Sequence, residues 1–145
     1  MYKRQDYQAI LEIYSKSKLD ELINESKKFK LLPLDEDPKR LAELKESDIY
    51  VYEDGGTLGY GAIFGAEIRA LFVHPSGRGK GLGKHLLEYM LSKVEGAATL
   101  YVAKTNDNAK GLYEKFGFTV VDEFETEYNG PSVFANKMVR TIGNG

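Results

Sequence analysis

The chain has 145 residues, of which 42% are hydrophobic and 29% are charged, as expected for one globular domain with its own core. Its 22 acidic and 20 basic residues leave a net charge of −2, which argues against a broad face for nucleic acid or membrane. Cysteine is absent, which excludes a disulfide framework, a thiolate metal site and a cysteine nucleophile. We therefore expect a single domain over residues 1–145.

The N-terminal residues have no apolar segment of the kind found in signal peptides, and no window of the sequence is apolar enough to span a bilayer. Together with the absence of cysteine, this predicts a cytoplasmic protein. His74 and His85 are the only histidines, and neither stands at metal-ligand spacing from other ligands. No metal site is expected.

Helical patterns dominate the N-terminal part. Apolar residues recur at three- and four-residue spacing over residues 6–16, and the stripe continues to about residue 28 as a second helix or as one bent helix. Asp37 and Pro38 then form a helix start, with a capping residue followed by proline at the first helical position. A short helix is predicted there.

From residue 48 the apolar pattern changes to a period of two. Strands are predicted over residues 49–53, 57–64, 67–73, 99–103, 118–128 and 132–139. Asp54-Gly55-Gly56 and Asn129-Gly130 are hairpin turns within this series. Helices are predicted over residues 82–95 and 106–116. This order of elements predicts an α/β fold with a mixed sheet of the α+β kind.

A turn rich in glycine and positive charge joins the 67–73 strand to the next helix: Arg78-Gly79-Lys80-Gly81-Leu82-Gly83-Lys84. Glycines let a backbone approach a ligand closely, and a helix start offers unpaired N–H groups and the positive end of the helix dipole. Such a turn suits a phosphate or pyrophosphate. The alternative is that the glycines only permit a tight connection between strand and helix.

Spacing excludes two common phosphate-binding motifs. The second glycine of a nucleoside-triphosphate P-loop would fall on Leu82 or Lys84, and the following hydroxyl position is His85. The dinucleotide pattern Gly-x-Gly-x-x-Gly fails at the same two positions. The pattern that fits is Arg/Gln-x-x-Gly-x-Gly/Ala, matched by Arg78, Gly81 and Gly83.

A second block follows within residues 106–118. It has the pattern Asn-x-x-Ala-x-x-x-Tyr-x-x-x-Gly-Phe, matched by Asn106, Ala109, Tyr113, Gly117 and Phe118. The two blocks, in this order and separated by a helix and a strand, resemble the GNAT superfamily of N-acetyltransferases.

The resemblance implies the GNAT-type acyl-CoA N-acyltransferase fold, in which helices flank a central, mostly antiparallel sheet. In that fold the fourth and fifth strands, here residues 67–73 and 99–103, form a parallel pair that splays apart. The first strand of the family would be reduced to residues 2–5.

The resemblance also implies acetyl-CoA as the cofactor, with coenzyme A as product, and direct attack by a primary amine in a ternary complex. Backbone N–H groups of the glycine turn would hold the pyrophosphate, and the backbone of the 67–73 strand would hold the pantetheine arm and the acetyl oxygen. The implied cofactor-binding residues are Leu71, Phe72, Val73, Arg78, Gly79, Lys80, Gly81, Leu82, Gly83, Lys84, Asn106 and Tyr113.

Tyr113 corresponds to the family's tyrosine that protonates the departing thiolate. A tyrosine hydroxyl stays protonated near neutral pH and can donate, which suits that role. The alternative is an aromatic residue that only packs near Phe116. Asn106 either contacts the cofactor arm or only caps its helix.

Glu67 is the candidate general base, because some family members place a glutamate on this strand. Strand alternation predicts that it shares a face with Arg69, Leu71 and Val73. The alternative is a solvated carboxylate, or one paired with Arg69. His74 is a weaker candidate, with a suitable intrinsic pKa but a position next to the phosphate turn.

The acceptor is expected to be a small-molecule or peptide amine, without nucleic acid or membrane as a partner, and a homodimer is common in such folds. Tyr50, Tyr52 and Tyr60 are expected near the acceptor cleft unless they only pack the sheet. The acidic strand bearing Glu123, Glu125 and Glu127 would attract a cationic acceptor unless it is simply solvated. A catalytically silent acyl-CoA-binding sensor of the same fold is the alternative function.

Overall fold

The computed structural model describes residues 6–141, so the strand expected at residues 2–5 lies outside the described residues. A six-stranded sheet with the strand order β1-β2-β3-β4-β6-β5 forms the centre of the fold. All neighbouring strands run antiparallel except β3 and β4. The prediction of a mixed sheet, mostly antiparallel with one parallel pair, is confirmed.

Helices, short 3₁₀ turns (η) and strands alternate along the chain. Their bounds are α1 (Tyr7–Ser17), η2 (Lys18–Leu22), η3 (Leu34–Glu36), α2 (Pro38–Glu46), β1 (Asp48–Glu53), β2 (Thr57–Phe64), β3 (Glu67–Val73), η4 (Pro75–Gly77), α3 (Leu82–Leu91), β4 (Ala98–Ala103), α4 (Asp107–Lys115), β5 (Thr119–Glu127) and β6 (Ser132–Arg140). None of the helices within residues 6–141 is long and apolar enough to cross a membrane.

The helix predicted to continue to residue 28 is wrong, because α1 is followed only by η2. Tertiary contacts draw the segment after η2 towards the β4–α4 loop. The side-chain amide of Asn24 donates to the Thr105 carbonyl over 2.9 Å, and the Thr105 hydroxyl donates to Glu25. Leu22 is buried with Tyr128 against the β5–β6 hairpin. These contacts outweigh the local helical pattern.

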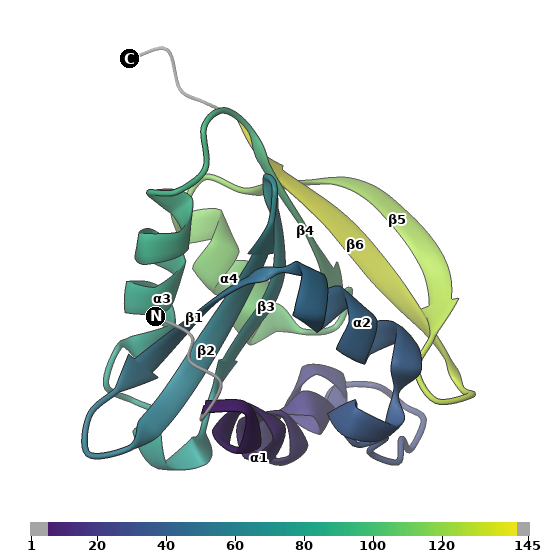
Figure 1. Cartoon of the computed structure of the whole chain (residues 1–145). Helices are drawn as coiled ribbons and strands as arrows, with labels where there is room; N and C mark the ends of the chain where they lie inside the picture. The colour runs from purple at the N-terminus through teal and green to yellow at the C-terminus, as the bar shows by residue number, and fades with distance from the viewer. Residues whose placement is uncertain (1–5, 142–145) are drawn as a thin grey trace.

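The helices cover both faces of the sheet, with α3 and α4 on one side and α1 and α2 on the other (Figure 1). On the α3 side, Leu87 and Met90 of α3 are fully buried against Leu100 of β4. On the α1 side, Ile10 and Ile13 pack in one cluster with strand residues such as Phe72. Burial of apolar side chains on both faces therefore fixes the sheet between two helical layers.

The parallel strands β3 and β4 pair only at their first residues. Glu67 lies opposite Thr99 and Ile68 lies opposite Leu100, and no further residues are paired. Beyond Ile68 the two strands diverge, so the predicted splay is confirmed. The backbone edge of β3 that faces β4 is left open over this stretch.

A β-bulge sits on β3 just where the splay begins. The pairing with β2 passes from Ile68 directly to Ala70, which leaves Arg69 as the extra residue. The bulge changes the alternation of side chains: Ile68 and Leu71 pack on the α3 side, whereas Ala70 and Phe72 pack on the α1 side.

Asp37 caps α2 as predicted. Its carboxylate accepts from the backbone N–H of Arg40 over 3.2 Å and from the Arg40 guanidinium over 2.8 Å. Burial works to raise the pKa of the Asp37 carboxyl, but the hydrogen bonds and the charge of Arg40 together leave that pKa below its usual value. The cap therefore contributes stability when Asp37 is ionised.

We expect Asp37→Ala to lower the free energy of unfolding by about 1–3 kcal/mol, because it removes both the cap and the partner of Arg40. Asp37→Asn is the matched control, since its amide oxygen can still cap the helix. A depressed folded-state pKa means that the wild-type advantage over Asp37→Asn is full above the unfolded value of 3.8 and shrinks as the pH falls below it. Urea denaturation at pH 7 and pH 3 measures both effects. Equal stability of all three proteins at pH 7 would refute the role of this cap.

Candidate active site

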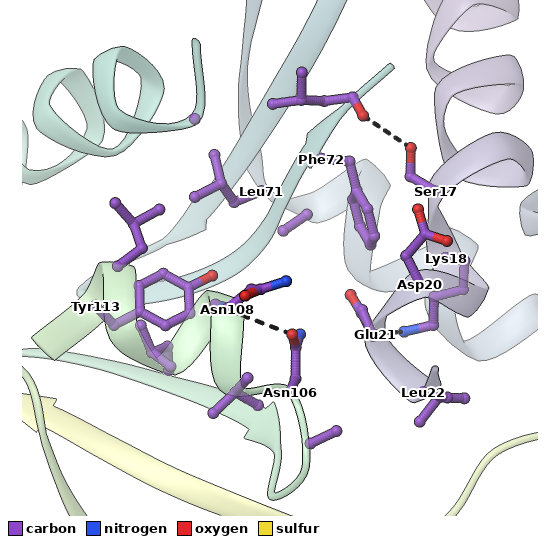
Figure 2. A pocket seen from close by; sticks show the side chains of 18 of the residues that line it. Ser17, Lys18, Asp20, Glu21, Leu22, Leu71, Phe72, Asn106, Asn108 and Tyr113 are labelled. Atoms are coloured by element: carbon purple, nitrogen blue, oxygen red, sulfur yellow. Dashed lines mark hydrogen bonds and ion pairs between the residues drawn. The ribbon is translucent and has the colours of Figure 1, made fainter. Parts of the chain in front are cut away.

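A cavity of about 840 Å³ opens where β3 and β4 diverge. Its walls come from η2, from the open half of β3, from the glycine turn and from α4 (Figure 2). Residues from both helical layers line it, so it reaches both faces of the sheet. Its volume lies in the range of small-molecule and cofactor sites.

The glycine turn leads into an uncapped helix start at one end of the cavity. Gly79 and Gly81 have φ values of 81° and 74°, a region that L-residues rarely adopt. Gly81 is the N-cap of α3 and supplies no side-chain cap, and the first helical hydrogen bond runs from the His85 N–H to the Gly81 carbonyl. The N–H groups of the first turn are therefore left for a ligand.

The residues of the glycine turn differ in whether their N–H groups are free and whether they line the cavity. The N–H of Arg78 donates to the Pro75 carbonyl over 3.3 Å, so the free N–H groups begin after Arg78 and not at it. Lys80 is the one member of the series that does not line the cavity. Gly83 packs near Val73 and Leu112, with room at 3.8–3.9 Å for a Cβ, in keeping with a Gly/Ala position.

The backbone of β3 divides between its neighbour β2 and the open edge. The His74 N–H donates to the Leu58 carbonyl over 2.7 Å, and antiparallel alternation then directs the backbone groups of Phe72 to β2 as well. Those of Leu71 and Val73 point to the open edge. Phe72 lines the cavity, while its backbone is engaged by the pairing with β2.

Part of the open edge is occupied by α1. The Ser17 hydroxyl donates to the Val73 carbonyl over 3.0 Å, which ties the end of α1 to the end of β3. Both groups of Leu71 and the N–H of Val73 remain available to a ligand in the cavity.

Tyr113 lines the cavity from α4. Its ring packs edge-to-face on Phe118 at a centroid distance of 5.9 Å, and its hydroxyl has no hydrogen bond to any residue within 6–141. Burial raises the pKa of Tyr113, and the charge of Glu21 adds to that rise. The hydroxyl therefore stays protonated at neutral pH and is free to donate.

Asn106 caps α4, which was one of the two roles predicted for it. Its side-chain oxygen accepts from the Ala109 N–H over 3.4 Å. Asn106 and its neighbour Asn108 also line the cavity, so the capping residue stands at the cavity wall (Figure 2).

Glu67 does not reach the cavity. The expectation that it shares a face with Leu71 and Val73 is wrong, because the bulge at Arg69 intervenes. The Glu67 carboxylate lies 3.4 Å from Arg69 Nε, and Arg69 also pairs with Glu46. Glu67 is therefore paired with Arg69, as the alternative prediction stated.

The remaining candidates from the sequence also lie elsewhere. His74 is not among the cavity residues, and its Nδ1 accepts from the Ser76 N–H over 3.1 Å. Tyr60 is buried in the α1-side core, while Tyr50 packs on Tyr89 and Tyr52 on His85. The three tyrosines pack the sheet and do not line this cavity.

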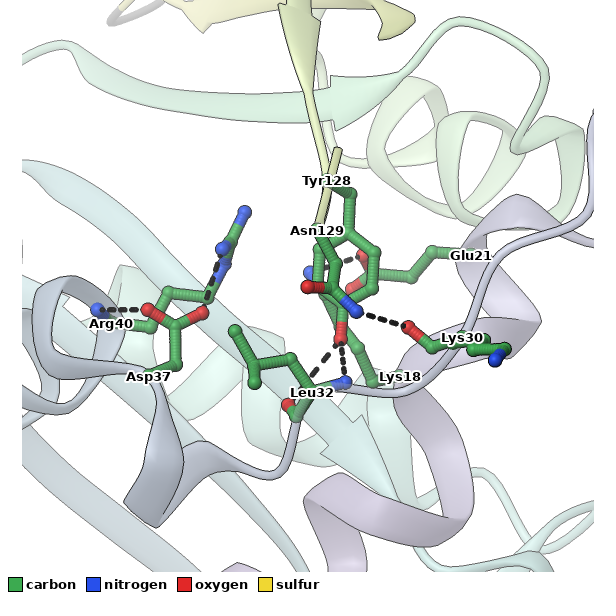
Figure 3. A network of polar contacts seen from close by, with 8 residues as sticks. All are labelled: Lys18, Glu21, Lys30, Leu32, Asp37, Arg40, Tyr128 and Asn129. Atoms are coloured by element: carbon green, nitrogen blue, oxygen red, sulfur yellow. Dashed lines mark hydrogen bonds and ion pairs between the residues drawn. The ribbon is translucent and has the colours of Figure 1, made fainter. Parts of the chain in front are cut away.

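The sequence did not single out several cavity residues. Asn108 lies on α4 beside Tyr113, and the others form the opposite wall: Ser17, Lys18, Asp20, Glu21, Arg40 and Tyr128. Lys18 Nζ lies 2.8 Å from the Glu21 carboxylate. Arg40 lies 5.0 Å from the centroid of the Tyr128 ring, whose hydroxyl accepts from the Leu32 N–H (Figure 3). The only sign of this wall in the sequence is the three-residue spacing of the opposite charges Lys18 and Glu21, and such pairs are common on exposed helices.

An ion pair joins the two walls at the exposed side. The Arg78 guanidinium of the glycine turn lies 2.5 Å from the Asp20 carboxylate of η2, and both side chains are about half exposed. On β5, Glu127 lines the cavity, whereas Glu123 pairs with Lys104.

Comparison with known proteins identifies the family. The model of the acetyltransferase (GNAT) domain matches residues 45–120, just over half of the chain. The peptidyl-lysine N-acetyltransferase YjaB of Salmonella typhimurium is 34% identical over 79 residues, which cover 54% of this chain and 54% of that relative. The chain thus matches about half the length of this curated relative.

Solved structures share the fold at low sequence identity. A GCN5-related N-acetyltransferase from Rhodopseudomonas palustris superimposes with a TM-score of 0.77 at 18% identity, over 97% of this chain and 92% of that one. The acetyltransferase yncA from Salmonella typhimurium, solved with its cofactor acetyl-CoA, gives 0.72 at 20% identity, over 99% and 92%. The expected GNAT fold is confirmed, and the chain belongs to the GNAT family of acetyltransferases.

Proposed function

We propose that this chain is an N-acetyltransferase that binds acetyl-CoA in the cavity of the splay and passes the acetyl group to a primary amine. One observation carries the proposal: a single cavity contains the uncapped start of α3 at one end and the unpartnered hydroxyl of Tyr113 on its wall. The first suits a pyrophosphate, and the second suits a leaving thiolate. We further propose that residues 1–145 act as one GNAT domain.

The cofactor would lie along the open edge of β3. The N–H groups of residues 79–84 would hold the pyrophosphate, supported by the charges of Arg78 and Lys84. The pantetheine arm would add to the edge of β3 through Leu71 and Val73, as an extra strand does. In this arrangement the thioester would lie between Val73 and Tyr113. The neighbour yncA, solved with acetyl-CoA, makes acetyl-CoA the first cofactor to test.

The reaction would be a direct displacement in a ternary complex. The amine nitrogen attacks the thioester carbonyl, a C–N bond forms, the C–S bond breaks, and the coenzyme A thiolate takes the proton of Tyr113. The nitrogen gives up one proton as it becomes an amide, and that proton restores the tyrosine hydroxyl. No covalent enzyme intermediate is required.

The relative YjaB is named a peptidyl-lysine N-acetyltransferase, so a lysine side chain is the first acceptor to test. Glu127 is exposed at the cavity wall on β5 and would favour a cationic acceptor. Both points support a primary alkylamine as the proposed acceptor class.

A combined binding and turnover assay tests the proposal. Acetyl-CoA at about one hundred times its Kd should raise the melting temperature by about 5–10 °C, because binding of that strength adds about 2.7 kcal/mol to the folded state. Release of free thiol should accelerate when lysine-type amines are added. A melting shift without amine-dependent thiol release would favour the acyl-CoA sensor, and no melting shift would overturn the cofactor site.

A further inference from the structure

Glu21 is a half-buried carboxylate among the residues that line the cavity. Glu21 projects from η2, and Figure 2 shows it reaching into the cavity towards Asn108 and Tyr113 on α4. Only one of its oxygens, Oε2, is bonded, to Lys18 at 2.8 Å. Oε1 has no hydrogen bond to any residue within the described range 6–141.

The partner of Glu21 is itself held in place. Lys18 Nζ lies 5.3–5.9 Å from the ring centroids of Tyr128, Tyr14 and Phe72, which is cation–π range. Its side chain is 13% exposed, so the ammonium is largely withdrawn from solvent. A cation fixed in this way holds the Glu21 carboxylate in one orientation through the ion pair between them.

The other carboxylates near the cavity are less suited to take a proton at its centre. Asp20 and Glu127 line the cavity but are exposed, and Asp20 is paired with Arg78. Asp37 does not line the cavity and is bound by Arg40. Glu67 lies outside the cavity, as described above.

We propose that Glu21 is the proton acceptor for the amine, with Lys18 as its positioning residue. The inference rests on the proposed acetyl transfer and completes it. The free Oε1 of Glu21 takes one proton from the incoming ammonium, the resulting amine attacks the thioester carbonyl, and Tyr113 gives its proton to the departing thiolate. The nitrogen loses its second proton as it becomes an amide, and that proton restores the tyrosine hydroxyl, while Glu21 releases its own proton to solvent. Acid and base thus face each other across the cavity, one from each helical layer.

Several charged and titratable groups surround Glu21 from the packed elements. They are Lys18 and Asp20 on η2, Tyr14 on α1, Arg40 on α2, Tyr60 on β2, Tyr113 on α4 and Tyr128 after β5. The tyrosines stay neutral at physiological pH, and Arg40 stays charged. Burial raises the pKa of Tyr14, Tyr60 and Tyr113, so a change in the pH profile of a Glu21 variant below pH about 9 does not arise from these three tyrosines.

Glu21→Gln tests the proposal with Nα-acetyl-lysine amide as the single amine acceptor. We expect kcat near neutral pH to fall by about 100-fold, the usual contribution of a general base. Turnover of the variant then depends on the fraction of acceptor that is already a free amine. Its log kcat should therefore rise with pH, with a slope near one, towards the lysine pKa of about 10.4. The wild-type profile should instead flatten near neutral pH. The deficit should shrink steadily as the pH rises.

Glu127→Gln is the matched control, because it removes the same charge from the same cavity. A purely electrostatic effect predicts similar losses in the two variants and unchanged pH profiles, whereas a proton acceptor predicts the altered slope only in Glu21→Gln. The melting shift with acetyl-CoA, measured for both, establishes that each variant is folded and binds cofactor.

Two outcomes would overturn the inference in distinguishable ways. If wild type turns over the lysine derivative and Glu21→Gln matches it within threefold with the same pH profile, Glu21 is not the base although the proposed function stands. If wild type releases no thiol with this amine at any pH, acetyl transfer to a lysine-type amine fails, and the role of Glu21 fails with it.

Discussion

Tyr113→Phe is expected to lower kcat by about 100-fold, while the affinity for acetyl-CoA stays within a factor of two. The substitution removes only the hydroxyl, and that hydroxyl has no hydrogen bond to residues 6–141 that its loss would break. The ring keeps its packing on Phe118. The loss therefore falls on protonation of the thiolate, a step that occurs only during reaction.

Steady-state kinetics with acetyl-CoA and a calorimetric titration of the cofactor separate the two effects. Tyr50→Phe is the control, because Tyr50 packs on Tyr89 outside the cavity, and its turnover should match that of wild type. Since burial, and then the charge of Glu21, raise the pKa of Tyr113, its ionisation should cause no fall in kcat below pH about 10. Wild-type kcat in Tyr113→Phe would remove this residue from the mechanism.

Gly81→Ala should weaken acetyl-CoA binding by about tenfold. Gly81 has φ 74°, and an L-residue held there is strained by about 1–2 kcal/mol, so the turn would relax away from the shape that presents its N–H groups. A Cβ at this position meets nothing within 4 Å in the protein itself. Any loss of affinity therefore comes from backbone strain or from a steric clash between the new Cβ and the bound cofactor.

The hairpin residue Gly55 provides a closely matched control. It has φ 68° and equally open surroundings, but lies between β1 and β2, outside the cavity. Gly55→Ala should therefore lower stability by a similar amount and leave the Kd for acetyl-CoA unchanged, as measured by calorimetry. Equal Kd values for wild type and Gly81→Ala would contradict a pyrophosphate site at the start of α3.

The glycine turn and Tyr113 could be predicted from the sequence because each is encoded locally. The turn needs glycines at fixed spacing before a helix, and α4 carries its cap and its tyrosine within one short block. Glu21 had no such signal, since it lines the same cavity as Tyr113 only once η2 and α4 have packed in the folded protein. Nothing in the sequence near residue 21 distinguishes it from a surface charge.

The expectation that Glu67 shares a strand face with Leu71 and Val73 failed for a different reason. Strand alternation assumes a regular pairing, and one extra residue at Arg69 moves Leu71 and Val73 to the other face. The same bulge stands at the start of the splay. The bulge that breaks the alternation of side chains thus lies where β3 begins to diverge from β4.

The central claim is that acetyl-CoA lies along the open edge of β3 with its pyrophosphate at the start of α3. Backbone amide shifts of the isotope-labelled chain, followed by NMR during titration with acetyl-CoA, test it directly. The account predicts the largest shifts at residues 79–84, at Leu71 and Val73, and around Tyr113, with little change in the hairpin at Gly55. Shifts absent from residues 79–84, or concentrated on the outer face of β1 and α3, would contradict it.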